Sequence, residues 1–458
     1  MKKIIFFIIL LITIKMSSQN KQVLYDFADL PQTLLLNPAI EPSYKFHVGL
    51  PFLSGISSNI GSSNFKLTDI FANDGRNIND KISSVINSIS SRDFVAINTQ
   101  IEIINAGFRL RDNYYINFGF YQEIDAIGYF PRDLLVFFNE GNATNLNRPF
   151  SASHIRYKFD YLGVLHAGIS KKINDKLSVG GRLKIYSSSI NLQSNNNTGT
   201  FTTVNGQNSV YRHVFSNVNV NLLTSGLIEN NEYVDDAKSI VKNTFFGSNA
   251  NVGLGFDFGL NYKISDQLQF SASLLDIGFI TYKNNIKNTR ISGDHIFEGV
   301  EFEYDANSNI DYWGQIDQAF KDQLPNTEDE VAYTSFRPVK LNAALKYSFG
   351  EQRRLLCYDD VYKDYYTDAL GVQLFNVFRP LSPQLALTAF YEKAISKKTR
   401  SKITYTIDDF SYANIGFGFS TQVSKLNFYA LVDNILEFSN LSSANSISFQ
   451  LGFNLIFN

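Results

Sequence analysis

The chain closes with the stretch Ser446–Phe457, SISFQLGFNLIF, in which apolar and polar side chains alternate. Successive side chains of a β-strand point to opposite faces, so this stretch has one apolar face and one small or polar face. Phe453, Leu455 and Phe457 belong to the apolar face, and Gly452 belongs to the other. The pattern predicts a strand that separates an apolar environment from a polar one.

This strand favours a membrane-spanning barrel over a soluble sheet. An aromatic residue next to the last position, here Phe457, is typical of the terminal strands of bacterial outer-membrane barrels. We expect the barrel assembly machinery to recognise Gly452, Phe453, Leu455 and Phe457. The alternative is the edge strand of a soluble β-sandwich. Alternating segments of about ten to fifteen residues match a tilted membrane crossing better than the five or six residues usual in sandwiches.

Length and composition agree with a membrane barrel. The chain has 458 residues, which is long for one soluble domain but suits a barrel with long loops. Charged residues make up 18%, below the roughly 25% of soluble domains. The net charge of −2 gives no reason to expect a nucleic-acid partner. The single cysteine, Cys357, excludes an intrachain disulfide and a cysteine-rich metal site, and we expect no cofactor.

The N-terminus has the features of a signal peptide. Lys2 and Lys3 precede the apolar run Ile4–Ile14, and small residues at positions 17–18 offer a cleavage site after Ser18. The apolar run is too short to span a membrane as a helix. We therefore assign residues 1–18 to a signal peptide. An exported chain rich in alternating aromatic segments is expected in the bacterial outer membrane.

Residues 19–43 are predicted to form a hatch inside the barrel. The segment is rich in leucine but does not alternate, and Pro31, Pro38 and Pro42 prevent a regular strand. A loosely ordered periplasmic tail is the alternative, although the density of leucine favours burial. The residues expected to fix the hatch in place are Leu35, Asn37 and Pro38.

Residues 44–458 are assigned to an antiparallel transmembrane barrel. The clearest alternation runs from Ala250 to Lys263. Tight turns follow the strands that end near Leu110, Ser170 and Ile264, which places these turns on the periplasmic side. The large insertions at 193–248 and 282–333 are predicted to be extracellular loops.

Strand parity leads to a barrel of about 14 strands. Outer-membrane barrels of one chain have an even strand number, with short turns on the periplasmic side. The count agrees from both ends of the chain only if a hairpin is inferred at Arg353–Tyr358 and Ala369–Phe378, with Asp359–Tyr366 as its outer loop. The first strand is placed at Lys45–Phe52, beside the terminal strand.

The chain resembles the FadL-like group of outer-membrane proteins, as found in Bacteroidota. The resemblance rests on the apolar segment that leads to Asn37-Pro38-Ala39 and on two similar strand ends, Leu274–Gly278 and Leu431–Ile435. The inferred strand number also agrees. The resemblance implies a channel or transporter, while the two large insertions depart from it and suit docking of partners.

Few residues suggest a catalytic or metal-binding site. The sequence has no HExxH or Gly-x-Ser-x-Gly motif, and its five histidines are scattered, so we expect no enzyme. Asp276 and Asp433 each end an apolar alternation and are candidates for a polar group at the outer mouth, although aspartate also simply terminates strands. The cluster Asp359, Asp360 and Asp364 is a candidate for calcium, or a solvated loop.

These observations predict a channel or transporter for hydrophobic or amphipathic compounds. The alternative is a non-enzymatic accessory subunit of an outer-membrane protein export or assembly complex. A lipid hydrolase is disfavoured because the nucleophile motif is missing. The expected partners are the bilayer with its outer-membrane lipids, the assembly machinery during biogenesis, and in the alternative a large outer-membrane complex.

Overall fold

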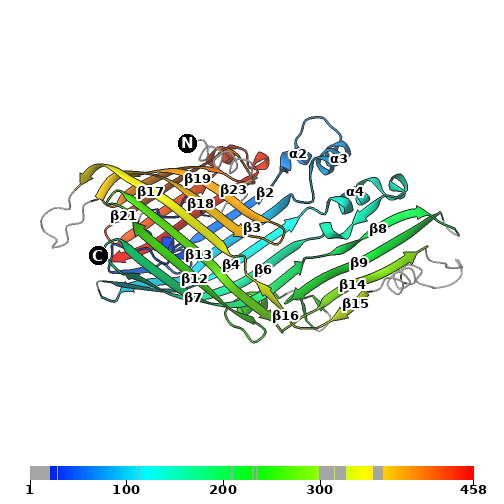
Figure 1. Cartoon of the computed structure of the whole chain (residues 1–458), viewed down its shortest axis with the longest axis horizontal. Helices are drawn as coiled ribbons and strands as arrows, with labels where there is room; N and C mark the ends of the chain where they lie inside the picture. The colour runs from blue at the N-terminus through cyan, green and yellow to red at the C-terminus, as the bar shows by residue number, and fades with distance from the viewer. Residues whose placement is uncertain are drawn as a thin grey trace.

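The computed structural model describes residues 21–27, 29–111, 113–207, 210–229, 232–233, 236–298, 314, 326–353 and 365–457. The predicted signal peptide, residues 1–18, and the acidic cluster of Asp359, Asp360 and Asp364 lie outside the described residues. Figure 1 shows a barrel with a long sheet extending from one end.

The wall is a closed antiparallel barrel with 14 strand positions, as the parity count predicted. Two of these positions hold a broken strand, β1 with β2 and β16 with β17. In chain order the strands are β1 (Phe46–Gly49), β2 (Ile56–Ser62), β3 (Phe94–Arg109), β4 (Tyr114–Tyr129), β6 (Tyr157–Lys172), β7 (Leu177–Ser194), β12 (Asn251–Lys263), β13 (Leu268–Tyr282), β16 (Tyr333–Phe336), β17 (Lys340–Arg353), β18 (Tyr365–Phe378), β19 (Pro383–Ala394), β20 (Thr399–Ile407), β21 (Asn414–Val423), β22 (Leu426–Asp433) and β23 (Ser446–Phe457).

The terminal strand closes the barrel against the first strand position. β23 pairs with β22 on one side and with β1 and β2 on the other, through pairs such as Phe46 with Phe457. The first strand was predicted as one run, Lys45–Phe52, but it breaks after Gly49 because Phe52 adopts a left-handed φ of 61°. A methyl group at Gly452 would overlap the Ser54 carbonyl oxygen at this break, so glycine is required there.

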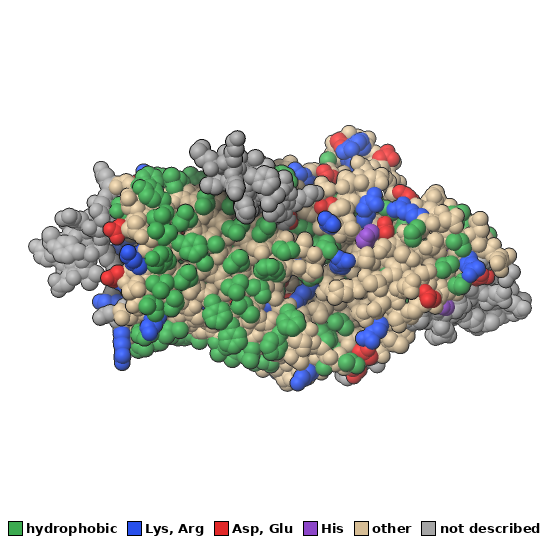
Figure 2. All heavy atoms as spheres, in the orientation of Figure 1, with side chains coloured by type: hydrophobic (Ala, Val, Ile, Leu, Met, Phe, Trp, Pro, Cys, Tyr) green, Lys and Arg blue, Asp and Glu red, His purple; other side chains and the backbone are tan. Residues whose placement is uncertain are grey.

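The outer face of the wall is apolar and the inner face is polar. On β12, Val252, Leu254, Phe256 and Phe258 are 42–55% exposed, while Asp257 between them is fully buried. Figure 2 shows such side chains gathered in a broad band over the barrel, which thins out toward the extension. A band of this kind faces acyl chains in a bilayer, so the barrel spans the membrane, and barrels of this type belong to the bacterial outer membrane.

Among the described helices, none is long and apolar enough to cross a membrane.

The inferred hairpin at residues 353–378 is wrong in detail. β17 runs on to Arg353, which pairs with Tyr365 at the start of β18, so these two strands meet at the end that carries the tight turns. The predicted strand Arg353–Tyr358 lies largely outside the described residues. The strand number is preserved because β20, for which no strand was predicted, fills the missing place. Its apolar face is short, and Lys402 on the other face masks the pattern.

Much of the two large insertions is folded and does not form simple loops. Strands from both insertions, with β5, build a second sheet that continues from the outer end of the barrel (Figure 1). Its strands are β5 (Pro149–Ser151), β8 (Thr198–Asn205), β9 (Tyr211–Ser225), β14 (Asn288–Phe297) and β15 (Asn326–Asp329), and β10 (Ile228–Glu229) pairs separately with β11 (Glu232–Tyr233).

Short helices lie in the outer connections. They are α2 (Leu67–Phe71), α3 (Ile78–Ser88), α4 (Arg132–Glu140) and α5 (Ala237–Thr244), with 3-10 turns η2 (Ala143–Asn145), η3 (Ala152–His154), η4 (Ile435–Ser439) and η5 (Leu441–Ser443). Figure 1 places α2, α3 and α4 on the outer side of the barrel, near the start of the extension.

Candidate functional site

The N-terminal segment, described at residues 21–27 and 29–43, lies inside the barrel. Its partners come from strands all around the wall, including Gln373 on β18, which donates to Gln22 at 2.9 Å, and Asn454 on β23, which donates to Gln32 at 3.0 Å. The 3-10 helix η1 (Pro31–Leu35) begins with proline, whose fixed φ suits a first helical position. The segment thus occupies the lumen that the polar faces of the strands create.

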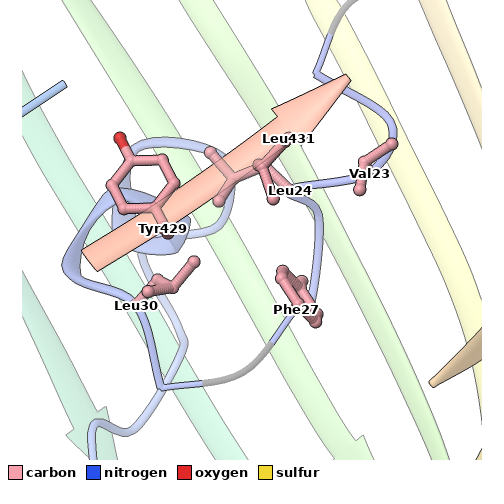
Figure 3. Packing of buried hydrophobic residues seen from close by; sticks show 6 residues of the cluster. All are labelled: Val23, Leu24, Phe27, Leu30, Tyr429 and Leu431. Carbon is pink, nitrogen blue, oxygen red and sulfur yellow. The ribbon is translucent and has the colours of Figure 1, made fainter. Parts of the chain in front are cut away.

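One side of this segment packs against an apolar patch on the inner wall. Figure 3 shows the apolar side chains of the segment gathered around two side chains of β22. The wall side of the patch is narrow, since it consists of two residues of one strand. The members of the cluster are Val23, Leu24, Phe27 and Leu30 from the segment and Tyr429 and Leu431 from β22.

A further set of polar contacts is directed at the segment's backbone. Lys402 on β20 donates to the Tyr25 carbonyl oxygen at 2.6 Å, and Ser273 on β13 donates to that of Leu36 at 2.6 Å. Arg182 on β7 donates through Nη2 to the Leu34 carbonyl and through Nη1 to the Leu35 carbonyl, the latter at 3.2 Å. Charged donors make hydrogen bonds of roughly 1.5–3 kcal/mol each, so these contacts hold the segment in place.

The three residues predicted to fix the segment lie together in the lumen. Asn37 accepts the Ala39 amide at 2.9 Å through Oδ1 and donates to the Leu260 carbonyl oxygen of β12 at 3.3 Å. Leu35 packs against the buried aromatic cluster that includes Tyr121 and Tyr186.

Pro38 is accommodated by glycines of the wall. A methyl group at Gly180 on β7 would overlap the Pro38 carbonyl, and one at Gly259 on β12 would overlap Asn37. Neither glycine was predicted from the sequence to have this role. Their position inside strands was the available signal, because glycine within a strand marks close approach of another backbone.

Asp276 belongs to the lumen and lies within a strand, not after one. β13 continues to Tyr282, and Asp276 forms a bulge with a φ of 60°, a conformation that aspartate tolerates better than most residues. The bulged amide donates to Asp257 Oδ1 at 2.7 Å. The carboxylate accepts from Lys184 at 2.6 Å and from Lys340 at 2.8 Å.

A continuous series of charged contacts runs inward from Asp276 to the N-terminal segment. Lys184 contacts both Asp276 and Asp257, the latter at 2.9 Å. Asp257 also binds Arg182 at 2.9 Å, and both side chains are fully buried. Since Arg182 holds the Leu34 and Leu35 carbonyls, the series ends on the segment's backbone.

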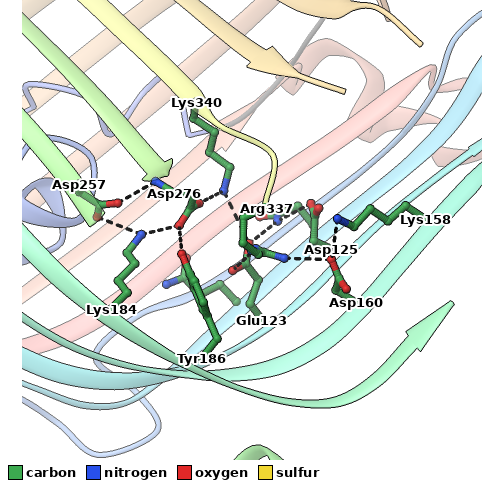
Figure 4. Close-up of polar contacts among 12 residues, drawn as sticks. Glu123, Asp125, Lys158, Asp160, Lys184, Tyr186, Asp257, Asp276, Arg337 and Lys340 are labelled. Atoms are coloured by element: carbon green, nitrogen blue, oxygen red, sulfur yellow. Dashed lines mark hydrogen bonds and ion pairs between the residues drawn. The ribbon is translucent and has the colours of Figure 1, made fainter. Parts of the chain in front are cut away.

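The same series runs outward to the mouth of the barrel (Figure 4). Lys340 lies 3.7 Å from Glu123, and Arg337 bridges Glu123 at 2.9 Å and Asp160 at 3.1 Å. Asn98 donates to Glu123 at 3.0 Å and to Asp125 at 3.1 Å.

Arg379 ends the series at the outer side. Its two Nη atoms bind the two oxygens of Asp125 at 2.6 and 2.9 Å. Figure 4 shows the charged side chains of this series pointing toward one another from different strands. We call the set the ion chain; its charged members are Glu123, Asp125, Lys158, Asp160, Arg182, Lys184, Asp257, Asp276, Arg337, Lys340 and Arg379.

Asp433 lies apart from the ion chain. It ends β22, is 4% exposed, and makes no ion pair among the residues that the structure describes. Its Oδ1 has no hydrogen-bond partner in that part of the chain. The structure therefore does not bring the two predicted aspartates, Asp276 and Asp433, into one site.

The residues of the terminal strand make aromatic contacts on the outer face. Phe453 packs on Phe428 with ring centroids 5.0 Å apart, and Phe457 packs on Phe46 at 5.5 Å. Lys425 lies 4.8 Å from the Phe457 ring. Leu455 pairs in register with Val48 and Leu426, and Gly452 faces inward.

The space left in the described lumen is small. Two cavities beside the N-terminal segment measure about 30 and 10 Å³, which is room for one or a few water molecules, and a third, of about 160 Å³, lies between β17, β18 and β19 beside Lys346 and Glu392. A larger groove of about 730 Å³ opens at the outer mouth, where Arg337 and Arg379 line it. The residues therefore form an outer groove, a buried ion chain and a segment that fills the lumen.

Comparison with known proteins gives one family and several similar solved structures. Residues 38–433 match the model of a family described as a family of unknown function, DUF5723. No curated protein matches the sequence. Among solved structures, a Pseudomonas aeruginosa FadL homologue is similar, with a TM-score of 0.46 and 10% identity over 97% of this chain and 99% of that chain. The Ralstonia pickettii toluene transporter TbuX has a TM-score of 0.40 and 11% identity, over 93% of this chain and 94% of that one.

Proposed function

This chain belongs to the DUF5723 family, and we propose that it is an outer-membrane channel or transporter for hydrophobic or amphipathic compounds. In this proposal residues 21–43 act as a hatch that closes the lumen. Passage depends on binding and displacement, without covalent chemistry.

The way in which the hatch is held carries the proposal. Arg182, Lys402 and Ser273 bind its backbone carbonyls, and such hydrogen bonds can be exchanged for water without breaking a strand of the wall. The barrel itself is closed by its own strand pairs and does not need the hatch for closure. A plug with these properties is suited to opening.

The ligand class follows from what the hatch covers. Displacing it would uncover Tyr429 and Leu431 on β22, and Phe375 on β18, which lines a small cavity together with Leu36 of the hatch. A pore for hydrophilic solutes has a polar lumen. An apolar patch next to the charged residues supports a ligand with both apolar and polar parts.

A disulfide that locks the hatch tests the proposal. Val23 of the hatch packs against Gly418 of β21, where an added Cβ atom would lie 2.6 Å from Val23 Cγ1, so we would replace both with cysteine in a Cys357→Ser background. The purified protein is reconstituted in vesicles and uptake of a fluorescent fatty acid is measured. We expect oxidation to abolish uptake and reduction to restore it.

The matched control is a disulfide within the wall. Thr388 and Thr406 face each other on β19 and β20, with their Oγ1 atoms 2.9 Å apart, and neither has a hydrogen bond to the described residues of the hatch. Oxidation of this pair should leave uptake unchanged. Uptake that persists through a locked hatch would rule the hatch out as the gate.

The outer sheet gives a reason to keep the accessory-subunit alternative. β8, β9, β14 and β15 extend beyond the barrel; Ile296 on β14 is 46% exposed, and Val210, just before β9, is 75% exposed. A surface of this kind suits a protein partner. The native protein is solubilised in mild detergent and purified. Recovery only as a stoichiometric complex with a large partner, together with absence of uptake activity, would favour the accessory role.

A further inference from the structure

The periplasmic end of the barrel carries a group of lysines on three neighbouring strands. β6, β7 and β12 lie side by side, and the Lys263 amide donates to the Lys176 carbonyl oxygen at 2.7 Å where the strands end. Lys171, Lys176 and Lys263 are exposed, and none of them makes an ion pair among the residues that the structure describes. Figure 2 shows basic side chains at this end of the apolar band, away from the extension.

Few acids offset these lysines. Asp175, in the turn between β6 and β7, is bound by Lys172 at 2.8 Å. Asp266, in the turn after β12, is exposed. Glu41 of the N-terminal segment accepts from Ser178 at 3.2 Å on the inner side of the wall. The outer surface at this end therefore has an excess of positive charge, which attracts anionic groups.

Lys171 belongs to the lipid face of the wall. It follows Leu165 and Ile169 at alternate positions of β6, and these two side chains are 44% and 43% exposed. Its ammonium group lies 5.2 Å from the ring centre of Tyr114, its partner in register on β4. Tyr262, near the end of β12, is 41% exposed on the same face. Lysine and tyrosine at the edge of an apolar band lie at the level of the lipid headgroups.

A gap in the apolar face lies next to this lysine. Gly181 of β7 pairs in register with Ile169 of β6 on one side and with Phe258 of β12 on the other. A Cβ atom added at Gly181 would have only the Asp257 carbonyl oxygen within 4 Å, at 3.9 Å. Phe258 is 55% exposed, so the glycine lies in a shallow depression between two large side chains. An acyl chain that lay there would be in contact with both.

We propose that this face of the barrel binds an anionic phospholipid of the periplasmic leaflet. The phosphate contacts Lys171 and the two neighbouring lysines, and one acyl chain lies over Gly181. A lipid fits better than a protein partner, because the depression continues the apolar band that faces the bilayer. We call the set the lipid site; its members are Tyr114, Lys171, Lys176, Gly181, Phe258 and Lys263. The inference goes beyond the channel proposal, since the site lies outside the barrel and does not involve the hatch.

Titration of lipids into the delipidated protein, followed by native mass spectrometry, tests the site. The protein is held in a non-ionic detergent, and the lipids are phosphatidylglycerol and phosphatidylethanolamine with the same acyl chains. We expect phosphatidylglycerol to bind about fivefold more tightly or better, because lysines at the membrane surface attract anionic lipids. Glycerol 3-phosphate, the headgroup chemistry without acyl chains, should not displace it. Displacement by glycerol 3-phosphate would identify a dissolved phosphate compound as the ligand and overturn the lipid proposal.

Two pairs of lysine substitutions locate the headgroup contact. Lys171→Gln with Lys176→Gln should reduce the preference for phosphatidylglycerol to about twofold or less. Lys397→Gln with Lys398→Gln is the matched control, because it removes the same charge from the turn between β19 and β20. The control should keep the wild-type preference. An equal loss in both pairs would assign the preference to the charge of the whole rim and overturn the site.

Two glycine substitutions locate the acyl-chain contact. Gly181→Leu fills the depression and should weaken both lipids about threefold or more, while the preference for phosphatidylglycerol remains. Gly128→Leu is the matched control, because Gly128 lies at the outer end of β4 and a Cβ atom there also meets open space. It should leave binding unchanged. Equal binding of the two lipids by the wild-type protein, or unchanged lipid binding in Gly181→Leu, would overturn the proposal.

Discussion

Arg182 joins the buried carboxylate of Asp257, 2.9 Å from its Nη1, to the backbone of the N-terminal segment, whose Leu35 carbonyl lies 3.2 Å from the same atom. One guanidinium therefore links the last acid of the ion chain to the proposed hatch. Because arginine presents several donors in a fixed plane, it can make both contacts at once.

Replacing this arginine should loosen the hatch while the barrel persists. Arg182→Met removes the hydrogen bonds to Leu34 and Leu35, and Asp257 keeps Lys184 as its partner. We expect amides of residues 22–36 to exchange hydrogen about tenfold faster or more, since a charged hydrogen bond contributes roughly 1.5–3 kcal/mol. Arg379→Met is the matched control, because Arg379 lines the outer groove and binds Asp125. Equal exchange in both variants would contradict the role of Arg182.

Substitution of the two aspartates predicted from the sequence, Asp276 and Asp433, should lower the free energy of unfolding by very different amounts. Asp276→Asn leaves Lys184 and Lys340 without the charge that both of them contact, and breaking a buried ion pair costs about 3–5 kcal/mol. Asp433→Asn should cost less than about 1 kcal/mol, because Asp433 makes no ion pair within the described part of the chain. Urea unfolding in detergent measures both. A larger loss of unfolding free energy in Asp433→Asn than in Asp276→Asn would contradict the stabilising role of the ion chain.

The outer face of the barrel was readable from the sequence, because the bilayer demands an apolar side chain at every second position of a strand. Val252, Leu254 and Phe256 satisfy this demand and are exposed as expected. The terminal strand was also placed correctly, beside the first strand. β20 was missed, since a short strand with a charged inner face gives a weak alternation.

The inner face could not be derived in the same way. Lys184 and Asp276 are 92 residues apart, and their contact depends on strand register and on the bulge at Asp276. A pattern of alternation states that an inner position is polar but not which polar residue it meets. The groove escaped prediction for a similar reason, because it depends on where β18 ends relative to β16.

A single added methyl group should displace the hatch while the barrel stays folded. Gly180→Ala places a methyl group against the Pro38 carbonyl, whereas Gly128→Ala on β4 meets no heavy atom within 4 Å. Overpacking of this kind costs about 1–3 kcal/mol, and displacement of the hatch can relieve it. We expect the Gly180 variant alone to increase trypsin cleavage after Lys21 and uptake of the fluorescent fatty acid. Wild-type behaviour of both variants would show that the hatch does not rest on Gly180.

The position of β23 in the bilayer predicts a graded response to charge. Leu451 lies midway along the strand on its outer face, and Phe457 lies at its end, beside Lys425. Arginine on the lipid face costs about 2–4 kcal/mol at the bilayer midplane and about 0–1 kcal/mol near the interface. Leu451→Arg should therefore destabilise the barrel by about 2–4 kcal/mol and Phe457→Arg by 1 kcal/mol at most. Reversible folding into lipid vesicles is the appropriate measurement, because it does not involve the assembly machinery that is expected to recognise Phe457. Equal losses for the two variants would mean that β23 does not cross the bilayer with Leu451 at its centre.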